Sequence, residues 1–255
     1  MRLPVRGLVA AFGLLTVARV GDGSGIRSAL RWCLLVGAVL GGIAAGLVAA
    51  GHQLFPGTAG SALSAAIVLA VLALLTRGLH LDGLADTADG LGRIGDPQRS
   101  LQILRQADIG PFGVATVVLV VLIEVAALAR CIDVGRGPGA VLLAVVVGRL
   151  AMLQAGVRGI RAARSDGLGA QVAGTVPAPF AIAATVVVAA IAVTPVFAGH
   201  GAAALRLAIA VPVGSAAALL LRWRATARFG GITGDVFGAV CEIATAAALV
   251  TVAVR

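Results

Sequence analysis

The chain contains no lysine and no tyrosine, and only 11 of its 255 residues are acidic. It has three cysteines, Cys33, Cys131 and Cys241, which stand far apart. Their spacing therefore indicates neither a disulfide framework nor a zinc motif. Because lysine is missing, all 20 basic residues are arginine, and the formal net charge is +9. No nucleic-acid-binding motif accompanies this charge, so it indicates membrane topology and an anionic lipid or substrate, with no nucleic acid as partner.

Apolar residues are abundant: 60% of the chain is hydrophobic, 12% is charged, and the mean hydropathy is +1.05. This composition predicts an all-α, polytopic integral membrane protein, forming a single membrane-embedded domain over residues 1–255. A span needs about 20 apolar residues to cross roughly 30 Å of hydrocarbon. Runs of that kind occupy residues 30–50, 61–79, 111–129, 138–157, 178–198, 203–221 and 237–254.

A shorter apolar run, residues 7–18, precedes these seven. Its length suits an interfacial or re-entrant helix better than a full span. A signal peptide is the alternative, although no small-residue cleavage site follows the run cleanly.

The arginines predict the orientation in the membrane. With the amino terminus inside, fifteen arginines fall in inner segments, and only Arg130, Arg136 and Arg255 fall outside. Positive residues favour the cytoplasmic side, so the sequence predicts a multi-pass protein of the bacterial cytoplasmic membrane with an inner amino terminus. The unusual polar motifs then face the cytoplasm.

One of these motifs follows the second run and reads His80-Leu-Asp-Gly-Leu-Ala-Asp-Thr-Ala-Asp-Gly90. Asp82, Asp86 and Asp89 stand at i, i+4 and i+7, so on a helix they share one face and repel one another. A cation would relieve this repulsion, and oxygen ligands favour Mg²⁺ or Mn²⁺. Asp82 and Asp89 each precede glycine, so a role in turns or caps is the alternative.

Two other motifs lie on the same side, Arg161–Gly169 after the fourth run and Gly230–Asp235 after the sixth. A shared side suggests a shared site. Backbone N–H groups of the glycine-rich stretch can form an anion-binding nest, to which Thr233 and Asp235 add polar groups. A flexible connection between spans is the alternative.

Single polar residues also have two interpretations each. His80 is a candidate general base or metal ligand, or it satisfies a local hydrogen bond. Glu242 stands seven residues after Asp235 and is expected to face the same cavity. Glu124 and Arg149 lie deep in their runs and favour a structural pair across the bundle. Near the acidic motif stand three arginines that either contact phosphate or only follow the positive-inside rule: Arg93, Arg99 and Arg105.

The segment His80–Gly92 resembles the signature of cobalamin synthase, the adenosylcobinamide-GDP ribazoletransferase family. The resemblance continues through three further segments: Ile109–Gly113, Ala163–Gly169, and Gly230–Ala239 with Glu242 after it. One departure is Gln106-Ala-Asp108, where many members carry Asp-x-Arg. This puts a functional role for Asp108 in doubt and leaves Arg105 as the nearest basic residue.

The resemblance implies an enzyme that joins adenosylcobinamide-GDP to α-ribazole, or to its 5′-phosphate, and releases GMP. The product is adenosylcobalamin or its phosphate. This reaction is the last step of lower-loop assembly in cobalamin biosynthesis. Asp82, Asp86 and Asp89 are then the Mg²⁺ ligands, and one of these carboxylates or His80 takes the proton of the attacking hydroxyl. The implied substrate-binding residues are Arg93, Arg105, Arg161, Arg164, Thr233, Asp235 and Glu242.

Two alternatives remain. A CDP-alcohol phosphotransferase uses related chemistry, but its motif asks for an arginine where Asp86 stands, and no downstream Asp-x-x-x-Asp pair follows. A transporter would place carboxylates at mid-span, whereas this acidic motif sits at one membrane face. The sequence leaves the lower-ligand base and an oligomeric state open.

Overall fold

The computed structural model describes residues 3–18, 20, 25–92, 108–195 and 201–254. These residues form a bundle of helices without a strand, and two isolated bridges pair loop segments. The expected all-α class is therefore confirmed. The helices are α1 (Leu3–Leu15), α2 (Ile26–Ala29), η1 (Leu30–Trp32), α3 (Cys33–Leu54), α4 (Thr58–Leu75), α5 (Leu79–Gly92), α7 (Pro111–Asp133), α8 (Gly137–Ala155), α9 (Gly167–Val172), α10 (Ala178–Val193), α11 (Gly201–Phe229) and α12 (Gly234–Ala253).

Six of the described helical segments are long and apolar enough to span a membrane. They are Ile26–Leu54, Thr58–Leu75, Pro111–Asp133, Gly137–Ala155, Gly201–Phe229 and Gly234–Ala253. The run expected to be the fifth span forms α10, which is apolar but has 16 residues. At 1.5 Å per residue such a helix is about 24 Å long, shorter than the hydrocarbon core.

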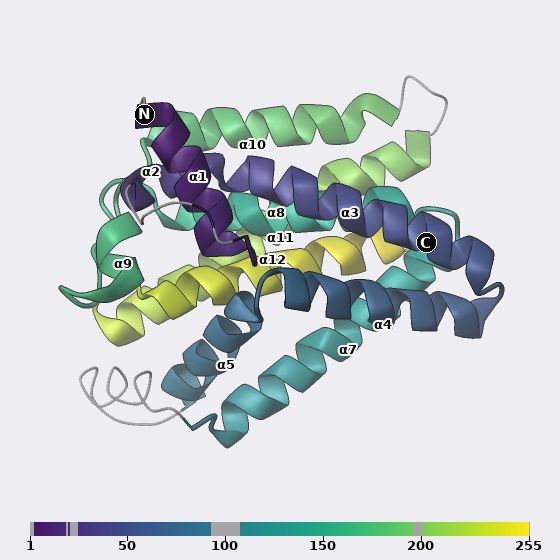
Figure 1. Cartoon of the computed structure of the whole chain (residues 1–255), viewed down its shortest axis with the longest axis horizontal. Coiled ribbons are helices and arrows are strands. Elements are labelled where there is room, and N and C mark those ends of the chain that lie inside the picture. Colours follow the sequence, from purple (N-terminus) through teal and green to yellow (C-terminus); the bar gives the residue numbers. More distant parts are fainter. Residues whose placement is uncertain (1–2, 19, 21–24, 93–107, 196–200, 255) are drawn as a thin grey trace.

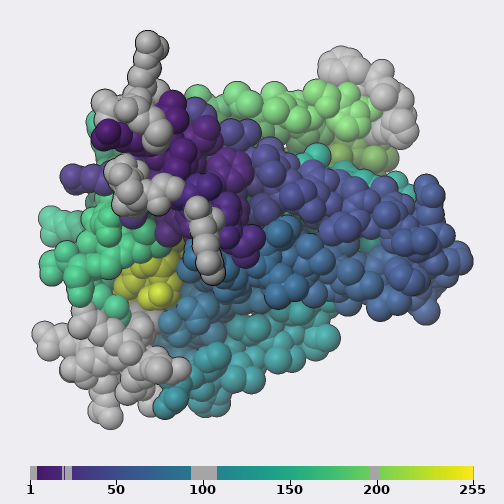
Figure 2. Space-filling view, viewed as in Figure 1, coloured from purple at the N-terminus to yellow at the C-terminus, as the bar shows by residue number. Residues whose placement is uncertain are grey.

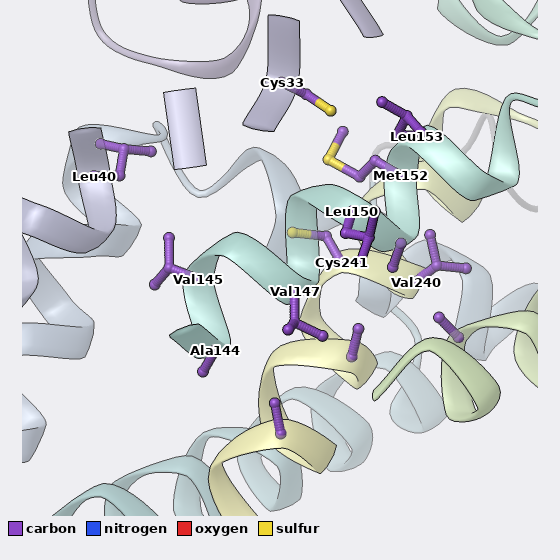
Figure 3. Packing of buried hydrophobic residues seen from close by; sticks show 14 of the residues in the cluster. Cys33, Leu40, Ala144, Val145, Val147, Leu150, Met152, Leu153, Val240 and Cys241 are labelled. Atoms are coloured by element: carbon purple, nitrogen blue, oxygen red, sulfur yellow. The ribbon is translucent and has the colours of Figure 1, made fainter. Parts of the chain in front are cut away.

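Helices α8 and α12 form the centre of the bundle (Figure 1). In their most apolar windows 72% and 67% of the residues are buried, against 28% in α4 and α7. Their buried residues are largely Ala, Val and Gly, and Figure 3 shows Leu150 of α8 beside Cys241 and Val240 of α12. Small residues let membrane helices approach closely, so the composition explains why these two helices pack together.

The amino-terminal run forms α1, which covers one end of the bundle (purple in Figure 2). Ala11 and Leu15 are fully buried, so this short helix belongs to the packed core. The chain after it is tied to the end of α4, because the N–H of Val17 donates to the carbonyl of Leu75 at 2.8 Å. A short helix in this region was expected, and the structure confirms it.

The acidic segment is a separate helix, α5, because α4 ends in two successive left-handed residues. Arg77 has φ 57° and Gly78 has φ 66°. The N–H of Gly78 closes the end of α4 by donating to the carbonyl of Ala73 at 2.7 Å. The guanidinium of Arg77 donates to the carbonyl of Leu14 at 3.0 Å, which fixes the break against α1. The break turns α5 away from the line of α4 and toward α7 and α12 (Figure 1).

Candidate active site

Two of the three polar motifs are joined by backbone hydrogen bonds. The N–H of Ile232 donates to the carbonyl of Arg161 at 2.8 Å, and the N–H of Ala163 donates to the carbonyl of Ile232 at 3.0 Å. These bonds form a parallel bridge between Ala162 and Ile232. A Cβ at Gly231 would stand 2.5 Å from the nitrogen of Ala163, so the bridge requires glycine there.

The acidic helix α5 lies against the start of α12. A Cβ at Gly83 would stand 2.5 Å from the carbonyl oxygen of Asp235, so the two helices meet at a glycine. The glycine-rich segment therefore contacts both other motifs. Figure 2 shows the beginning of α12 (yellow) at the surface between the α9 region (green) and α5 (blue). The structure thus brings together three segments that lie about 60 residues or more apart in the sequence.

A pocket of about 280 Å³ opens where the three segments meet. Polar lining residues come from each of them: His80, Asp82, Arg164, Asp166, Thr233 and Asp235. Apolar side chains of α1, η1 and α8 also line the pocket, together with apolar residues of α5, α9 and α12. A pocket with facing carboxylates and a guanidinium, reached by a glycine-rich backbone, can bind a phosphorylated ligand together with a cation.

Asp86 does not line this pocket, but its carboxyl interacts electrostatically with Asp235, Asp82 and Arg164, which do. Burial raises the pKa of its carboxyl to about 7, and the negative charges of Asp235, Asp82 and Asp89 add to the effect. Arg164 acts in the opposite direction. Carboxylates that raise one another's pKa in this way indicate a place where a cation or a proton is favoured.

Asp89 has a different environment from the one its spacing suggested. Its side chain is 4% exposed, and its carboxylate accepts hydrogen bonds from the N–H of Gly110 at 2.7 Å and of Gly113 at 3.0 Å. These donors belong to the first turn of α7, where a carboxylate is favourable. Asp89 therefore fastens α5 to α7. Asp82, Asp86 and Asp89 do not form a preassembled cage of three carboxylates, because two oxygens of the set serve this cap.

His80 lies behind the acidic face and is buried, with 2% of its surface exposed. Burial lowers the pKa of its imidazole well below the usual value, and the positive charge of Arg149 adds to this, so the ring is neutral. Its Nε2 has no hydrogen-bond partner. The ring reaches the pocket wall, but the proton-accepting role expected for it remains a prediction.

The expected substrate-binding residues divide into several groups. Thr233 caps α12 by accepting from the N–H of Val236 at 3.4 Å, and its side chain lines the pocket. Arg164 also lines the pocket, whereas the Arg161 side chain is exposed and its carbonyl serves the bridge. Glu242 lines a second cavity, of about 230 Å³, together with Glu124 and Arg149. Three arginines of interest lie outside the described residues: Arg93, Arg99 and Arg105.

Two features of the site were missed in the sequence. Asp166 lines the pocket, and its only signal was its place in the segment Ala163–Gly169. Asp235 was expected to bind substrate, but its interactions with Asp86 and Asp82 make it a fourth member of the acidic cluster. Nothing in local spacing could show this, because about 150 residues separate α5 from α12.

The fold and the pocket define a class of protein: a polytopic helical membrane protein whose acidic site lies beside the ends of its spans. The sequence model of the cobalamin-5-phosphate synthase family matches residues 7–253. The chain belongs to this family, and the resemblance of its four motifs is confirmed.

Curated relatives agree with the family model. A protein of Frankia casuarinae named adenosylcobinamide-GDP ribazoletransferase is 43% identical over 95% of this chain and 92% of its own length. A protein of Nocardioides sp. with the same name is 36% identical over 98% of this chain and 96% of its own. One of Pseudomonas savastanoi, also so named, is 42% identical over 75% of each chain. No solved structure matches the chain.

Proposed function

We propose that the protein is an adenosylcobinamide-GDP ribazoletransferase, which joins adenosylcobinamide-GDP to α-ribazole or its 5′-phosphate and releases GMP. The observation that carries the proposal is the pocket in which the acidic helix, Arg164 and the start of α12 meet. Relatives that match nearly the whole chain bear this enzyme's name.

The chemistry of the donor set fits Mg²⁺. Asp82, Asp86 and Asp235 interact electrostatically and offer only oxygen atoms. Mg²⁺ in enzymes is typically held by one or two carboxylates, with substrate phosphates and water completing the octahedron. We therefore propose these three aspartates as the metal-binding set, with Asp89 positioning α5 for it. Mn²⁺ suits the same oxygen ligands. When bound, the cation would supply positive charge to the diphosphate.

The side chains of the pocket perform the remaining tasks. Arg164 reaches the pocket from the loop before α9 and offers a planar guanidinium to a phosphate. The backbone around Gly234, at the start of α12, offers N–H groups to the same anion. Displacement at phosphorus then needs the attacking hydroxyl and the leaving GMP in line, which is a matter of positioning and charge. One carboxylate of the acidic cluster accepts the proton of the hydroxyl; in the metal-free protein, Asp86 is the carboxylate whose surroundings most favour protonation.

The location follows from the same proposal. Arg164 lines the pocket, and Arg161 and Arg228 stand a few residues before its lining residues in the sequence, on the arginine-rich side of the bundle. Positive residues favour the inner side of the membrane. We therefore propose that the pocket faces the cytoplasm from the bacterial cytoplasmic membrane, where nucleotide substrates are available.

GMP release by the purified protein in lipid tests the proposal. We expect GMP from adenosylcobinamide-GDP only when α-ribazole and Mg²⁺ are both present, and at least about 100-fold less with Asp86→Asn. The matched control is Asp133→Asn, because Asp133 is an exposed carboxylate at the far end of α7. The absence of GMP from folded wild-type protein under all conditions would reject the assigned reaction. Equal losses in both variants would reject the assigned site.

A further inference from the structure

A second set of possible metal ligands lies inside the bundle, behind the acidic face. A nitrogen of His80, the sulfur of Cys241 and a carboxylate oxygen of Glu242 all lie within 4.8 Å of one another. Among the residues that the structure describes, this is the one group of three or more His, Cys, Asp or Glu that meets this distance. His80 comes from α5, and the other two come from α12, about 10 Å along the helix from its start.

Two members of the set are buried, Glu242 is half-buried, and the set is incompletely bonded. Cys241 is 0% exposed and His80 is 2% exposed, and His80 Nε2 has no hydrogen-bond partner. Figure 3 shows Cys241 among the aliphatic side chains of α8 and α12. An unpaired polar atom in such surroundings destabilises the fold, so a ligand that engages the imidazole nitrogen stabilises it.

Neighbouring charges suit a divalent cation. Glu124 and Arg149 line the cavity of about 230 Å³ that Glu242 also lines, and Glu124 Oε1 and Arg149 Nε have no hydrogen-bond partner either. A Cys241 thiolate and two glutamates carry three negative charges, which one guanidinium and one divalent cation neutralise completely. Zero net charge is the state that a membrane interior tolerates best.

We propose that His80, Cys241 and Glu242 form a site for a borderline transition metal such as Zn²⁺, with water or Glu124 at a fourth position. The nitrogen, sulfur and oxygen donors match the tetrahedral preference of Zn²⁺ and do not suit Mg²⁺, which prefers six oxygens. The site shares His80 with the wall of the proposed substrate pocket, whereas Cys241 and Glu242 do not line that pocket. It joins α5 to α12 and thereby fixes the acidic helix on the helix that carries Asp235. The sequence could not show it, because its single cysteine has no metal-ligand spacing.

Cobalt titration of the chelator-treated protein in lipid tests the site. We expect one Co²⁺ per chain, with visible bands of tetrahedral Co²⁺ and a sulfur-to-cobalt charge-transfer band in the near ultraviolet, all displaced by Zn²⁺. Cys241→Ser should remove the charge-transfer band and weaken binding about 10-fold or more. Cys131→Ser is the matched control, since Cys131 is equally buried but lies on α7 near Leu249. A wild-type protein without the band, or a loss with Cys131→Ser alone, would overturn the proposal.

A measurement on the wild type makes the test independent of how the variants fold. X-ray absorption at the zinc edge should show one sulfur and at least two nitrogen or oxygen ligands, and a shell without sulfur would overturn the site. The Mg²⁺-dependent release of GMP is followed in parallel. Because Cys241 has no part in the substrate pocket, Cys241→Ser should retain that activity at saturating Mg²⁺. Failure of the metal site and failure of the proposed reaction are therefore distinguishable.

Discussion

Gly83 of α5 packs directly on the backbone of Asp235 at the start of α12, with no room between them for a methyl group. This contact sets the distance between the acidic helix and the glycine-rich segment. It makes the geometry of the pocket depend on a residue that has no side chain of its own.

Gly83→Ala should therefore separate α5 from α12. Overpacking of this kind costs about 1–3 kcal/mol, and a shift of about 1 Å at a reacting centre can cost about 100-fold in rate. We expect a lower thermal unfolding temperature and a loss of GMP release that exceeds the loss of folded protein. Gly42→Ala in α3 is the control, because a Cβ there meets nothing within 4 Å. Full activity of the Gly83 variant would show that the contact does not set the geometry.

Asp89 should hold α5 in position against α7 and stabilise the fold. Asp89→Ala leaves the N–H groups of Gly110 and Gly113 without their acceptor, which should cost about 1–3 kcal/mol of unfolding free energy. Asp89→Asn keeps one carbonyl oxygen and should lose less. Chemical denaturation of both variants in detergent gives the comparison. If Asp89→Asn loses Mg²⁺ affinity while its stability is unchanged, Asp89 is a metal ligand as its sequence spacing predicted.

Asp86→Asn should lower the rate of GMP release and raise the thermal stability of the metal-free protein. The substitution removes the electrostatic repulsion between the Asp86 carboxylate and those of Asp82, Asp89 and Asp235. The metal-free variant should therefore unfold at a higher temperature than the metal-free wild type. The gain should stay below about 1 kcal/mol, because Asp86 is only partly buried and solvent screens it.

The pH dependence of that gain has a defined sign. The pKa of Asp86 is about 7 in the folded protein, against 3.8 as the ordinary value. The ionised carboxyl destabilises the fold above pH 7, and this effect diminishes as the pH falls from about 7 toward about 4, where both states are protonated. Melting curves in EDTA should therefore show the largest difference between wild type and variant above pH 7. A difference that does not change with pH would contradict the assigned environment.

Arg164→Lys should weaken substrate binding while the protein remains folded. The lysine retains the charge but cannot form two parallel bonds to a phosphate, so we expect KM for adenosylcobinamide-GDP to rise about 10-fold. Arg158→Lys is the control, because Arg158 is exposed and lies outside the pocket of about 280 Å³. Equal kinetics for the two variants would remove Arg164 from the phosphate site.

The sequence predicted the fold class well because long apolar runs have few structural solutions in a membrane. The helical face of α5 was also predictable from the spacing of Asp82 and Asp86. The partners of that face were not. Asp235 reaches Asp86 only because the end of α4 is broken at Arg77, which redirects α5 toward α12. Gly78 is a helix-end signal, but the sequence shows neither the left-handed conformation of Arg77 nor the direction that α5 takes after the break.

The environment of Asp89 could not be predicted for a related reason. Its bonds go to backbone N–H groups of α7, and any sequence offers such groups at a helix start. The described helix α10 ends at Val193, whereas the apolar run expected as the fifth span continues to residue 198, beyond the described residues.

The bridge between Ala162 and Ile232 is made of main-chain atoms alone. The residue at position 162 can therefore vary among relatives without loosening this side of the pocket, provided that position 231 stays without a side chain. A library that randomises these positions should recover active proteins with many residues at position 162 but with glycine alone at position 231. The pairing of the two loops thus depends on the missing side chain at position 231. Sequence variation at position 162 is compatible with the same backbone architecture.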